Sequence, residues 1–286
     1  RISWEILDAF RDAAAETGIP RIDDFNRGDN FGCAYFHVNQ RRGIRWTAAK
    51  AFLRPARGRP NLRIVTGAQA RRIIFEGRRA VGVDFALNGA AAGARAAREV
   101  VLAAGAIGSP HLLMLSGVGP AAALAAHGIA PVHDLPGVGA NLQDHLQLRC
   151  IFKVANTTTL NQTANSLLGR IRMGLDYALF RRGPMTMAPS TLGAFARSDA
   201  SIATANLEYH VQPLSLDRFG EPLHDFPAIT TSVCNLLPTS RGSVGLRGAP
   251  PFFPTEIAGE AVLVEEEDRA VADEEVFGVF ERGGRA

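Results

Sequence analysis

Small residues follow an apolar run near the middle of the chain. The run Val100–Ala103 is typical of a buried strand, and Ala104 and Gly105 follow it directly. A strand that ends on alanine and glycine leaves its backbone N–H groups free of side-chain cover, so a large flat cofactor can approach the main chain. The pattern predicts the ligand-facing strand end of an α/β sheet. A tight strand-to-helix connection is the alternative for the short Ala-Gly motif taken alone.

A second group of polar residues alternates with apolar ones further along the chain. Glu208, His210 and Gln212 are interleaved with Leu207, Tyr209 and Val211. Because successive side chains of a strand point to opposite faces, the three polar residues share one face. That face could line a binding site or could simply be solvated.

Several chemistries have no matching motif. The nearest approach to a dinucleotide fingerprint, residues 117–122, follows a predicted helix instead of a strand, and Pro120 removes a backbone donor. We find no Walker loop, no His-x-x-x-His pair on a helix and no Gly-x-Ser-x-Gly elbow. Cys33, Cys150 and Cys234 are too far apart to suggest a disulfide framework or a zinc site. This cysteine usage favours a reducing, cytoplasmic compartment.

Composition limits the partners. The 286 residues carry a formal net charge of +3, with arginines concentrated in residues 41–63 and acids in residues 260–275. The basic segment lacks aromatic residues at stacking spacing, so we expect a solvated surface and no nucleic-acid partner. No apolar run is long enough to span a membrane. The first residues, Arg1–Trp4, are neither a signal peptide nor a methionine start, so we expect a piece of a longer protein.

Periodicity and turn residues predict a mixture of helices and strands. A helix capped by Ser3 is expected to stop at Gly18, and residues 88–94 read as a small-residue linker. A further helix is expected over 167–180. The predicted strands are 62–66, 71–76, 80–87, 100–103, 148–154, 207–211 and 229–235.

Three segments carry a resemblance to a known family. Residues 99–120 contain the apolar run described above and end in Ser-Gly-Val-Gly-Pro, residues 45–53 read RWTAAKAFL, and residues 135–145 read LPGVGANLQDH. In this order the segments resemble the signatures of the glucose–methanol–choline (GMC) flavoprotein oxidoreductases. The resemblance covers residues 1–247 and is strongest for choline- and alcohol-dehydrogenase-like members.

The resemblance implies an FAD enzyme that oxidises a primary alcohol, with a histidine accepting the hydroxyl proton and the flavin accepting a hydride. It places Ala70 where a family residue holds the adenine through its backbone. It also places Ala104 and Gly105 beside the ADP half of the cofactor, and Asn141 on the loop that leads from the flavin domain to the substrate domain. The face of His210 and Gln212 would form a wall of the substrate pocket.

The implied fold class is α/β in the mixed α+β sense: part of a Rossmann-like FAD-binding domain and a substrate domain built on an antiparallel sheet. We predict a partial FAD-binding domain over 1–145, a partial substrate domain over 146–248 and an atypical acidic tail over 249–286.

The chain also departs from the family. It lacks the N-terminal glycine fingerprint for the FAD pyrophosphate and the C-terminal segment that carries the histidine base. We therefore assign no catalytic residue and expect the chain alone to be inactive. Two alternatives remain: a GMC-like lyase that cleaves cyanohydrins, and a non-catalytic remnant with an exposed apolar edge at Val101. The particular alcohol, the electron acceptor and the oligomeric state are left open.

Overall fold

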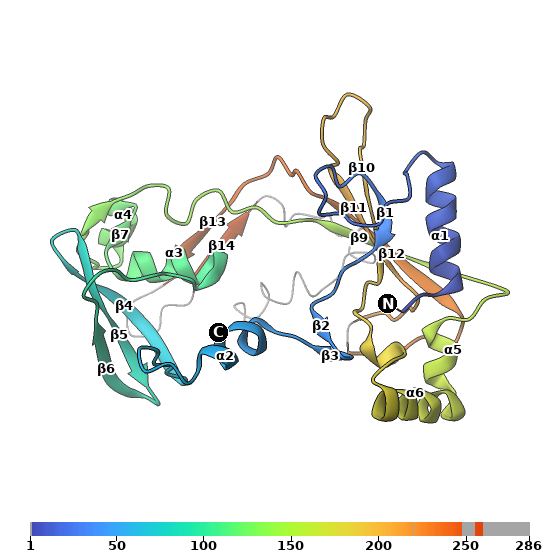
Figure 1. Ribbon diagram of the computed structural model, residues 1–286. Helices are drawn as coiled ribbons and strands as arrows, with labels where there is room; N and C mark the ends of the chain where they lie inside the picture. The colour runs from blue at the N-terminus through green and yellow to red at the C-terminus, as the bar shows by residue number, and fades with distance from the viewer. Residues whose placement is uncertain (1, 219, 248–254, 260–286) are drawn as a thin grey trace. The chain divides into compact units, whose positions relative to one another are not determined.

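A computed structural model describes residues 2–218, 220–247 and 255–259 (Figure 1). The described chain forms two compact units: unit 1 contains residues 2–56, 145–218 and 220–237, and unit 2 contains residues 57–144, 238–247 and 255–259. The chain leaves unit 2 at Asp144, whereas the predicted border lies between His145 and Leu146. The contiguous division into 1–145, 146–248 and 249–286 stays a prediction, and most of its last segment lies outside the described residues.

Unit 1 is built on a five-stranded antiparallel sheet in the order β1-β10-β11-β12-β9. The strands are β1 (Gly32–Tyr35), β9 (Gln147–Lys153), β10 (Leu192–Ala196), β11 (Leu207–Gln212) and β12 (Ala228–Asn235). The other elements of the unit are α1 (Glu5–Glu16), β2 (Gln40–Arg41), β3 (Ile44–Arg45), a π-helical turn (Ala49–Leu53), α2 (Arg54–Ala56), α5 (Leu160–Asn165), α6 (Leu167–Phe180) and a 3₁₀ turn (Pro184–Thr186).

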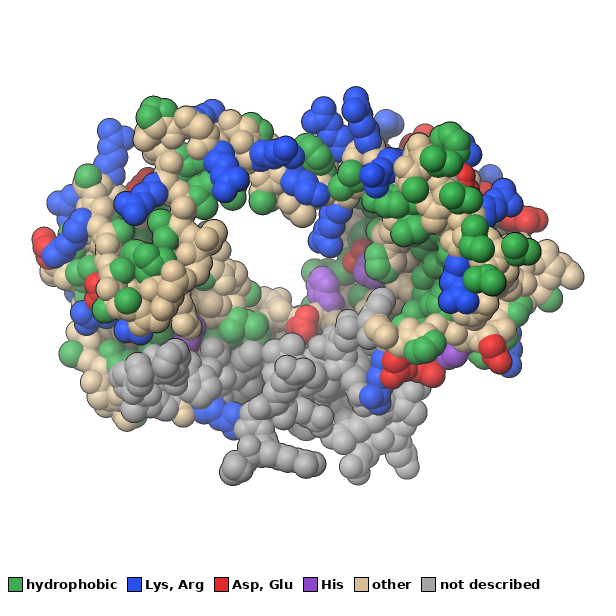
Figure 2. Space-filling model, turned by 90° about the horizontal axis from the view of Figure 1, so that it is seen from below, with side chains coloured by type: hydrophobic (Ala, Val, Ile, Leu, Met, Phe, Trp, Pro, Cys, Tyr) green, Lys and Arg blue, Asp and Glu red, His purple; other side chains and the backbone are tan. Residues whose placement is uncertain are grey.

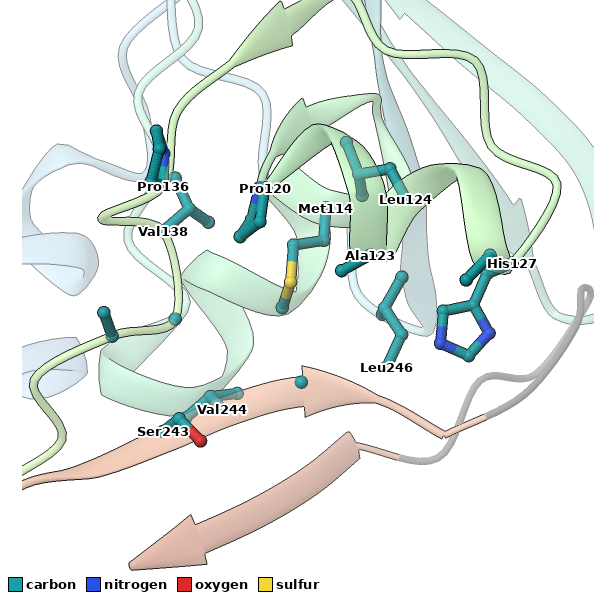
Figure 3. A pocket seen from close by; sticks show the side chains of 14 residues that line it. Met114, Pro120, Ala123, Leu124, His127, Pro136, Val138, Ser243, Val244 and Leu246 are labelled. Carbon is teal, nitrogen blue, oxygen red and sulfur yellow. The ribbon is translucent and has the colours of Figure 1, made fainter.

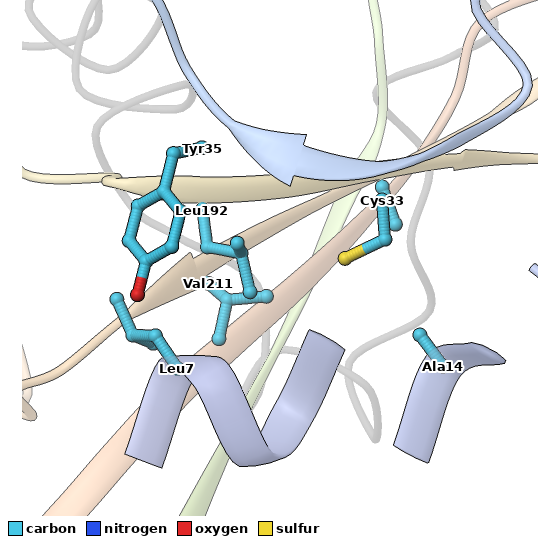
Figure 4. Close-up of a cluster of buried hydrophobic side chains, with 7 residues drawn as sticks. Leu7, Ala14, Cys33, Tyr35, Leu192 and Val211 are labelled. Carbon is cyan, nitrogen blue, oxygen red and sulfur yellow. The ribbon is translucent and has the colours of Figure 1, made fainter. Parts of the chain in front are cut away.

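Helix α1 covers one face of this sheet. Leu7 is fully buried against Tyr35, Leu192 and Val211, which point to the same face from β1, β10 and β11 (Figure 4). The helix begins after Trp4 instead of the predicted cap Ser3, since Trp4 is the extended residue that precedes the first turn. Gly18 follows the helix at a φ of +92°, which is the left-handed conformation expected of a helix stop.

The three cysteines differ in burial. Cys33 is fully buried in the α1-facing core, and burial raises the pKa of its thiol to about 11. Burial also raises the pKa of Cys234, helped by the negative charge of Glu208, whereas Cys150 is exposed. Because the thiolate is the reactive form, a disulfide reagent at pH 8 should label Cys150 first. A time course in which Cys33 or Cys234 of the folded chain reacts as fast as Cys150 would contradict this expectation.

Unit 2 contains a three-stranded antiparallel sheet, β4-β5-β6, with α3 beside it. The Ile73 amide of β4 donates to the Ser116 hydroxyl at the end of α3, at 2.7 Å. The elements are β4 (Ala68–Glu76), β5 (Arg79–Leu87), β6 (Ala90–Arg95), α3 (Gly105–Leu115), β7 (Val118–Gly119), α4 (Ala121–Ala126), β8 (His133–Asp134), β13 (Gly242–Leu246) and β14 (Thr255–Gly259).

The structure confirms the mixed α/β class with antiparallel sheets. The predicted helix over 167–180 and the strands around 71–87, 207–211 and 229–235 are also confirmed. The predicted linker over 88–94 is wrong, because most of it belongs to strand β6.

Two predicted strands are absent from the described chain. Residues 62–66 and 100–103 have no regular secondary structure and pair with no described strand, and Val101 is 80% exposed. A strand exists only by virtue of its hydrogen-bonded partners, and neither run finds one among the described residues. Within the same part of the chain, no helix has the length and apolar character needed to cross a bilayer.

Candidate cofactor and substrate site

The start of α3 presents open backbone. Gly105 opens the helix at a φ of +79°, and a Cβ built on it would have no heavy atom within 4 Å. Ala104 precedes it and is also exposed; its amide donates to the Ser109 hydroxyl at 3.2 Å. The next amides of the first turn have no acceptor within the helix. Such a helix start can accept a negatively charged group.

Asn141 lies on a loop that β13 holds on both sides. The Val244 amide donates to the Gly139 carbonyl at 2.7 Å, and Leu142 and Gly242 exchange two backbone hydrogen bonds of 2.9 and 2.7 Å. Between these anchors Asn141 adopts a φ of +59°, a left-handed conformation that asparagine tolerates better than most residues. The loop therefore holds the exposed Asn141 in a fixed backbone geometry.

The four unit 2 residues predicted to bind the cofactor share exposed positions in one unit. Ala70, Ala104, Gly105 and Asn141 are all exposed, and three of the four have minimal side chains. Ala70 lies in β4 at the start of a β-bulge, where the pairing with β5 shifts register. Open main chain and small side chains are what close approach of an ADP moiety needs. Unit 2 brings the four residues into one compact body, and their role in binding stays a prediction.

The sheet of unit 1 has a polar face opposite α1. The register places His210 beside Gly193 on one side and Ser232 on the other, while Gln212 lies beside Thr230. The Gln212, Thr230 and Ser232 side chains are buried, and so is Arg149 of β9, which donates to the carbonyls of Leu216 and Asp217. Gln212 is thus buried on this face, whereas Glu208 and His210 are half-buried.

Both ring nitrogens of His210 are engaged. The Gln147 amide nitrogen lies 3.1 Å from Nδ1, and Glu208 Oε1 lies 3.0 Å from Nε2. An amide nitrogen can only donate, so Nδ1 accepts, and the ring proton on Nε2 is donated to the Glu208 carboxylate. The pair of contacts fixes the ring orientation and its tautomer. His210 is accordingly held as an oriented polar group.

Gln212 offers an unused acceptor. Its amide nitrogen donates to the Ser190 hydroxyl at 3.2 Å, whereas its buried Oε1 has no hydrogen-bond partner among the described residues. A buried carbonyl without a donor is costly and invites a ligand or a water molecule. Oε1 of Gln212 can therefore accept a hydrogen bond from a hydroxyl group.

An aromatic cluster covers part of the polar face. The Phe36 ring lies over Gly193, so close that a Cβ at that position would collide with it, and its centroid is 5.6 Å from the His210 ring. Phe25 packs against both Phe36 and Phe195. Phe36 also lines a cavity of about 410 Å³ in unit 1, together with Tyr35 and Thr191. An apolar wall and oriented polar groups thus lie next to each other.

Unit 2 has a cavity of its own, of about 420 Å³ (Figure 3). It lies between α4, the end of α3 and β13, and Met114, Leu124 and Leu246 point toward it. Its described lining is apolar apart from His127 and Ser243. The sparse polar chemistry makes this cavity a weaker candidate than the polar face of unit 1.

Sequence reasoning grouped Glu208, His210 and Gln212 correctly on one face but missed their partners. Gln147 and Arg149 of β9 lie on the same face of the sheet. Gln147 is more than sixty residues away from His210 in the sequence. The alternation of polar and apolar residues over 147–150 was the available signal, because it has the same period of two. His210 and Gln212 as substrate-binding residues stay a prediction.

The comparisons with known proteins agree on one class, the flavin-dependent oxidoreductases of the GMC type. Residues 4–147 match the family described as GMC oxidoreductase, and the chain belongs to this family. GMC oxidoreductases are FAD-dependent enzymes whose N-terminal domain binds the cofactor, so the family, enzyme class and cofactor predicted from the sequence are confirmed at the level of the family.

The relatives are named for alcohol oxidation. An alcohol dehydrogenase [acceptor] from Pseudomonas putida is 40% identical over 247 residues, which is 85% of this chain and 45% of the relative. An oxygen-dependent choline dehydrogenase from Brucella ovis is 39% identical over 246 residues, 86% of this chain and 44% of the relative. The chain thus spans about half the length of the curated relatives it matches.

Solved structures show the same fold. Pyridoxine 4-oxidase from Mesorbium loti has a TM-score of 0.73 and 28% identity, over 98% of this chain and 51% of that one. A formate oxidase has a TM-score of 0.78 and 25% identity, over 89% of this chain and 49% of that one.

Proposed function

We propose that the protein is a cytoplasmic FAD-dependent oxidoreductase that converts a primary alcohol to an aldehyde, in the manner of alcohol or choline dehydrogenases. The observation that carries this proposal is the 40% identity to an alcohol dehydrogenase over 85% of the chain. The buried polar face with its unused Gln212 carbonyl oxygen supports it, because an alcohol hydroxyl is the matching donor.

The residues of unit 2 would hold the cofactor. The Gly105 amide and the other free amides of the first turn of α3 would donate to the diphosphate, while the β4 backbone at Ala70 would contact the adenine. The anchored loop would present Asn141 to the cofactor. When bound, FAD supplies the acceptor for the hydride that leaves the alcohol carbon.

The residues of unit 1 would orient the alcohol. Gln212 Oε1 would accept the hydroxyl hydrogen bond, and the Phe36 ring would exclude water beside His210. His210 would act as a positioning residue, since Gln147 and Glu208 occupy both of its nitrogens. No residue of this chain is assigned as the proton acceptor, so the chain alone should not oxidise alcohols.

The test is a fluorescence titration of the chain with FAD, comparing Ala104→Glu with Ala91→Glu. Both alanines are exposed, but only Ala104 adjoins the proposed diphosphate site, and Ala91 lies in β6. An acid beside the diphosphate should weaken FAD binding at least about tenfold, a loss of ~1.4 kcal/mol, while Ala91→Glu should bind FAD like the unsubstituted chain. The same samples should not reduce a dye acceptor when a primary alcohol is added.

A chain that does not quench FAD fluorescence, or two variants that weaken binding equally, would refute the cofactor site. Alcohol-dependent dye reduction by the chain alone would instead show that it contains a proton acceptor after all.

A further inference from the structure

The Phe36 ring lies directly on the polar face of the unit 1 sheet. Gly193 makes this possible, because a Cβ at that position would collide with the Cζ and Cε2 atoms of the ring. Gly193 pairs with His210 across β10 and β11, and the centroid of the Phe36 ring lies 5.6 Å from that of the His210 ring. The glycine therefore lets an aromatic ring occupy the space over the strand next to His210.

Neighbouring aromatic residues hold the Phe36 ring in place. The Phe25 ring lies 5.4 Å from it, centroid to centroid, and packs edge to face on Phe195 at 4.9 Å. All three rings are half-buried, in contrast to the hydrophobic side chains that Figure 2 shows among charged ones at the surface. Aromatic rings at such separations attract each other beyond the area that they bury. The Phe36 ring is therefore a fixed wall of the polar face.

The same ring adjoins the groups proposed to bind the alcohol. The Phe36 amide donates to the Thr191 carbonyl at 3.0 Å. The Gln212 side-chain amide donates to the hydroxyl of the preceding residue, Ser190, at 3.2 Å. Phe36 and Gln212 thus contact neighbouring residues of one segment, and Phe36 and Thr191 also line the unit 1 cavity of about 410 Å³. An alcohol whose hydroxyl group binds Gln212 would have the Phe36 ring beside its carbon chain.

We propose that Phe36 sets the size of the alcohol that the site accepts, in favour of short aliphatic primary alcohols over alcohols that carry an aromatic ring. This inference rests on the proposed function, because it concerns the same hydroxyl-binding face. The Phe36 ring already fills the space that an aryl group would need between Phe25 and His210, and packed interiors accommodate extra volume poorly. The ring cannot move toward the sheet, because the backbone at Gly193 lies directly beneath it.

Replacing Phe36 by alanine should reverse this preference. The substitution leaves an apolar space of the shape of a phenyl ring, bordered by Phe25 and the backbone at Gly193. An apolar cavity of about 150 Å³ in a protein interior stays dry and binds benzene. Benzyl alcohol carries such a ring on its hydroxyl carbon, so its ring can fill the space while its hydroxyl group donates to Gln212 Oε1.

The experiment is an NMR titration of the 286-residue chain with 1-propanol and with benzyl alcohol. The signal followed is the side-chain amide of Gln212, which is identified by its absence in Gln212→Leu. The test variant is Phe36→Ala, and Phe36→Leu is a milder second variant that keeps an apolar side chain against Phe25. The matched control is Phe52→Ala, since Phe52 belongs to the same unit but is 75% exposed. Thermal melts should show that the variants fold.

The unsubstituted chain and Phe52→Ala should bind 1-propanol at least about tenfold more tightly than benzyl alcohol, because the pocket lacks room for the aryl group. Phe36→Ala should bind benzyl alcohol at least about tenfold more tightly than the unsubstituted chain does, with Phe36→Leu in between and 1-propanol binding unchanged. Equal affinities of the unsubstituted chain and Phe36→Ala for benzyl alcohol would overturn the size limit and leave the alcohol site intact. A Gln212 signal that 1-propanol does not move would instead contradict the alcohol site itself, and the size limit with it.

Discussion

Replacing Asn161 by alanine should lower the free energy of unfolding by about 3–5 kcal/mol. The Asn161 side chain is fully buried at the start of α5. Its Nδ2 lies 3.0 Å from the carbonyls of Ser215 and His224, and its Oδ1 accepts from the Ser215 amide at 2.9 Å. The amide therefore ties α5 to the segment between β11 and β12, which the backbone hydrogen bonds of the sheet do not hold.

The magnitude follows from what alanine would leave behind. The buried Ser215 amide would lose its acceptor, and an unsatisfied buried group costs about 1–3 kcal/mol. The Ser215 carbonyl would lose one of its two donors and keep the His224 amide. The cavity left by the side chain adds to this loss. Asn161→Asp should be no better, because a carboxylate would face the carbonyl oxygens of Ser215 and His224.

Asn165→Ala is the matched control. Asn165 lies on the same helix and also donates to the His224 carbonyl, at 2.8 Å, but this hydrogen bond is exposed. Its loss should cost less than about 1 kcal/mol. Denaturant unfolding of both variants measures the difference. Equal midpoints for the two would show that the Asn161 contacts contribute no more than a surface hydrogen bond.

The sequence around Asn161 does not predict that its side chain joins α5 to the segment between β11 and β12. The segment LNQTAN reads as a polar helix, and its partners Ser215 and His224 lie more than fifty residues away. Sequence patterns predicted the elements that depend on residues close together in the chain. The turn at Gly77 joins β4 to β5, and the helical spacing of the leucines in α6 predicted the bounds of that helix. A polar network depends on segments brought together by the fold, so its members cannot be paired from local periodicity.

Strand predictions failed for a related reason. Residues 90–95 read AAAGAR, a composition with low strand propensity, but the unpaired edge of β5 recruits them as β6. Val100–Ala103 shows the opposite case, since its apolar composition is typical of a strand but no described segment pairs with it. In both cases the presence or absence of a hydrogen-bonded neighbouring strand decides whether the segment forms a strand. The site residues followed the same rule: alternation placed His210 and Gln212 on one face, whereas the pairing of β9 with β12 was needed to bring Gln147 to that face.

Gly139→Ala should destabilise unit 2 by at least about 3 kcal/mol and release the loop that carries Asn141. Gly139 adopts a φ of +82°, which costs an L-residue roughly 1–2 kcal/mol. A Cβ there would also collide with the Val244 carbonyl oxygen, a backbone atom of β13 that cannot rotate away. Relief would require breaking the 2.7 Å hydrogen bond from the Val244 amide to the Gly139 carbonyl.

Gly137→Ala provides the comparison two residues earlier in the same loop. A Cβ on Gly137 would have no heavy atom within 4 Å, and its φ lies outside the left-handed region. This variant should unfold at or slightly above the temperature of the unsubstituted chain, because alanine restricts the unfolded state. Thermal unfolding followed by circular dichroism should separate the two variants by more than ten degrees, at about 4 °C per kcal/mol. Similar midpoints would mean that β13 does not anchor the loop. The backbone of Asn141 would then not be held in a fixed position for cofactor binding.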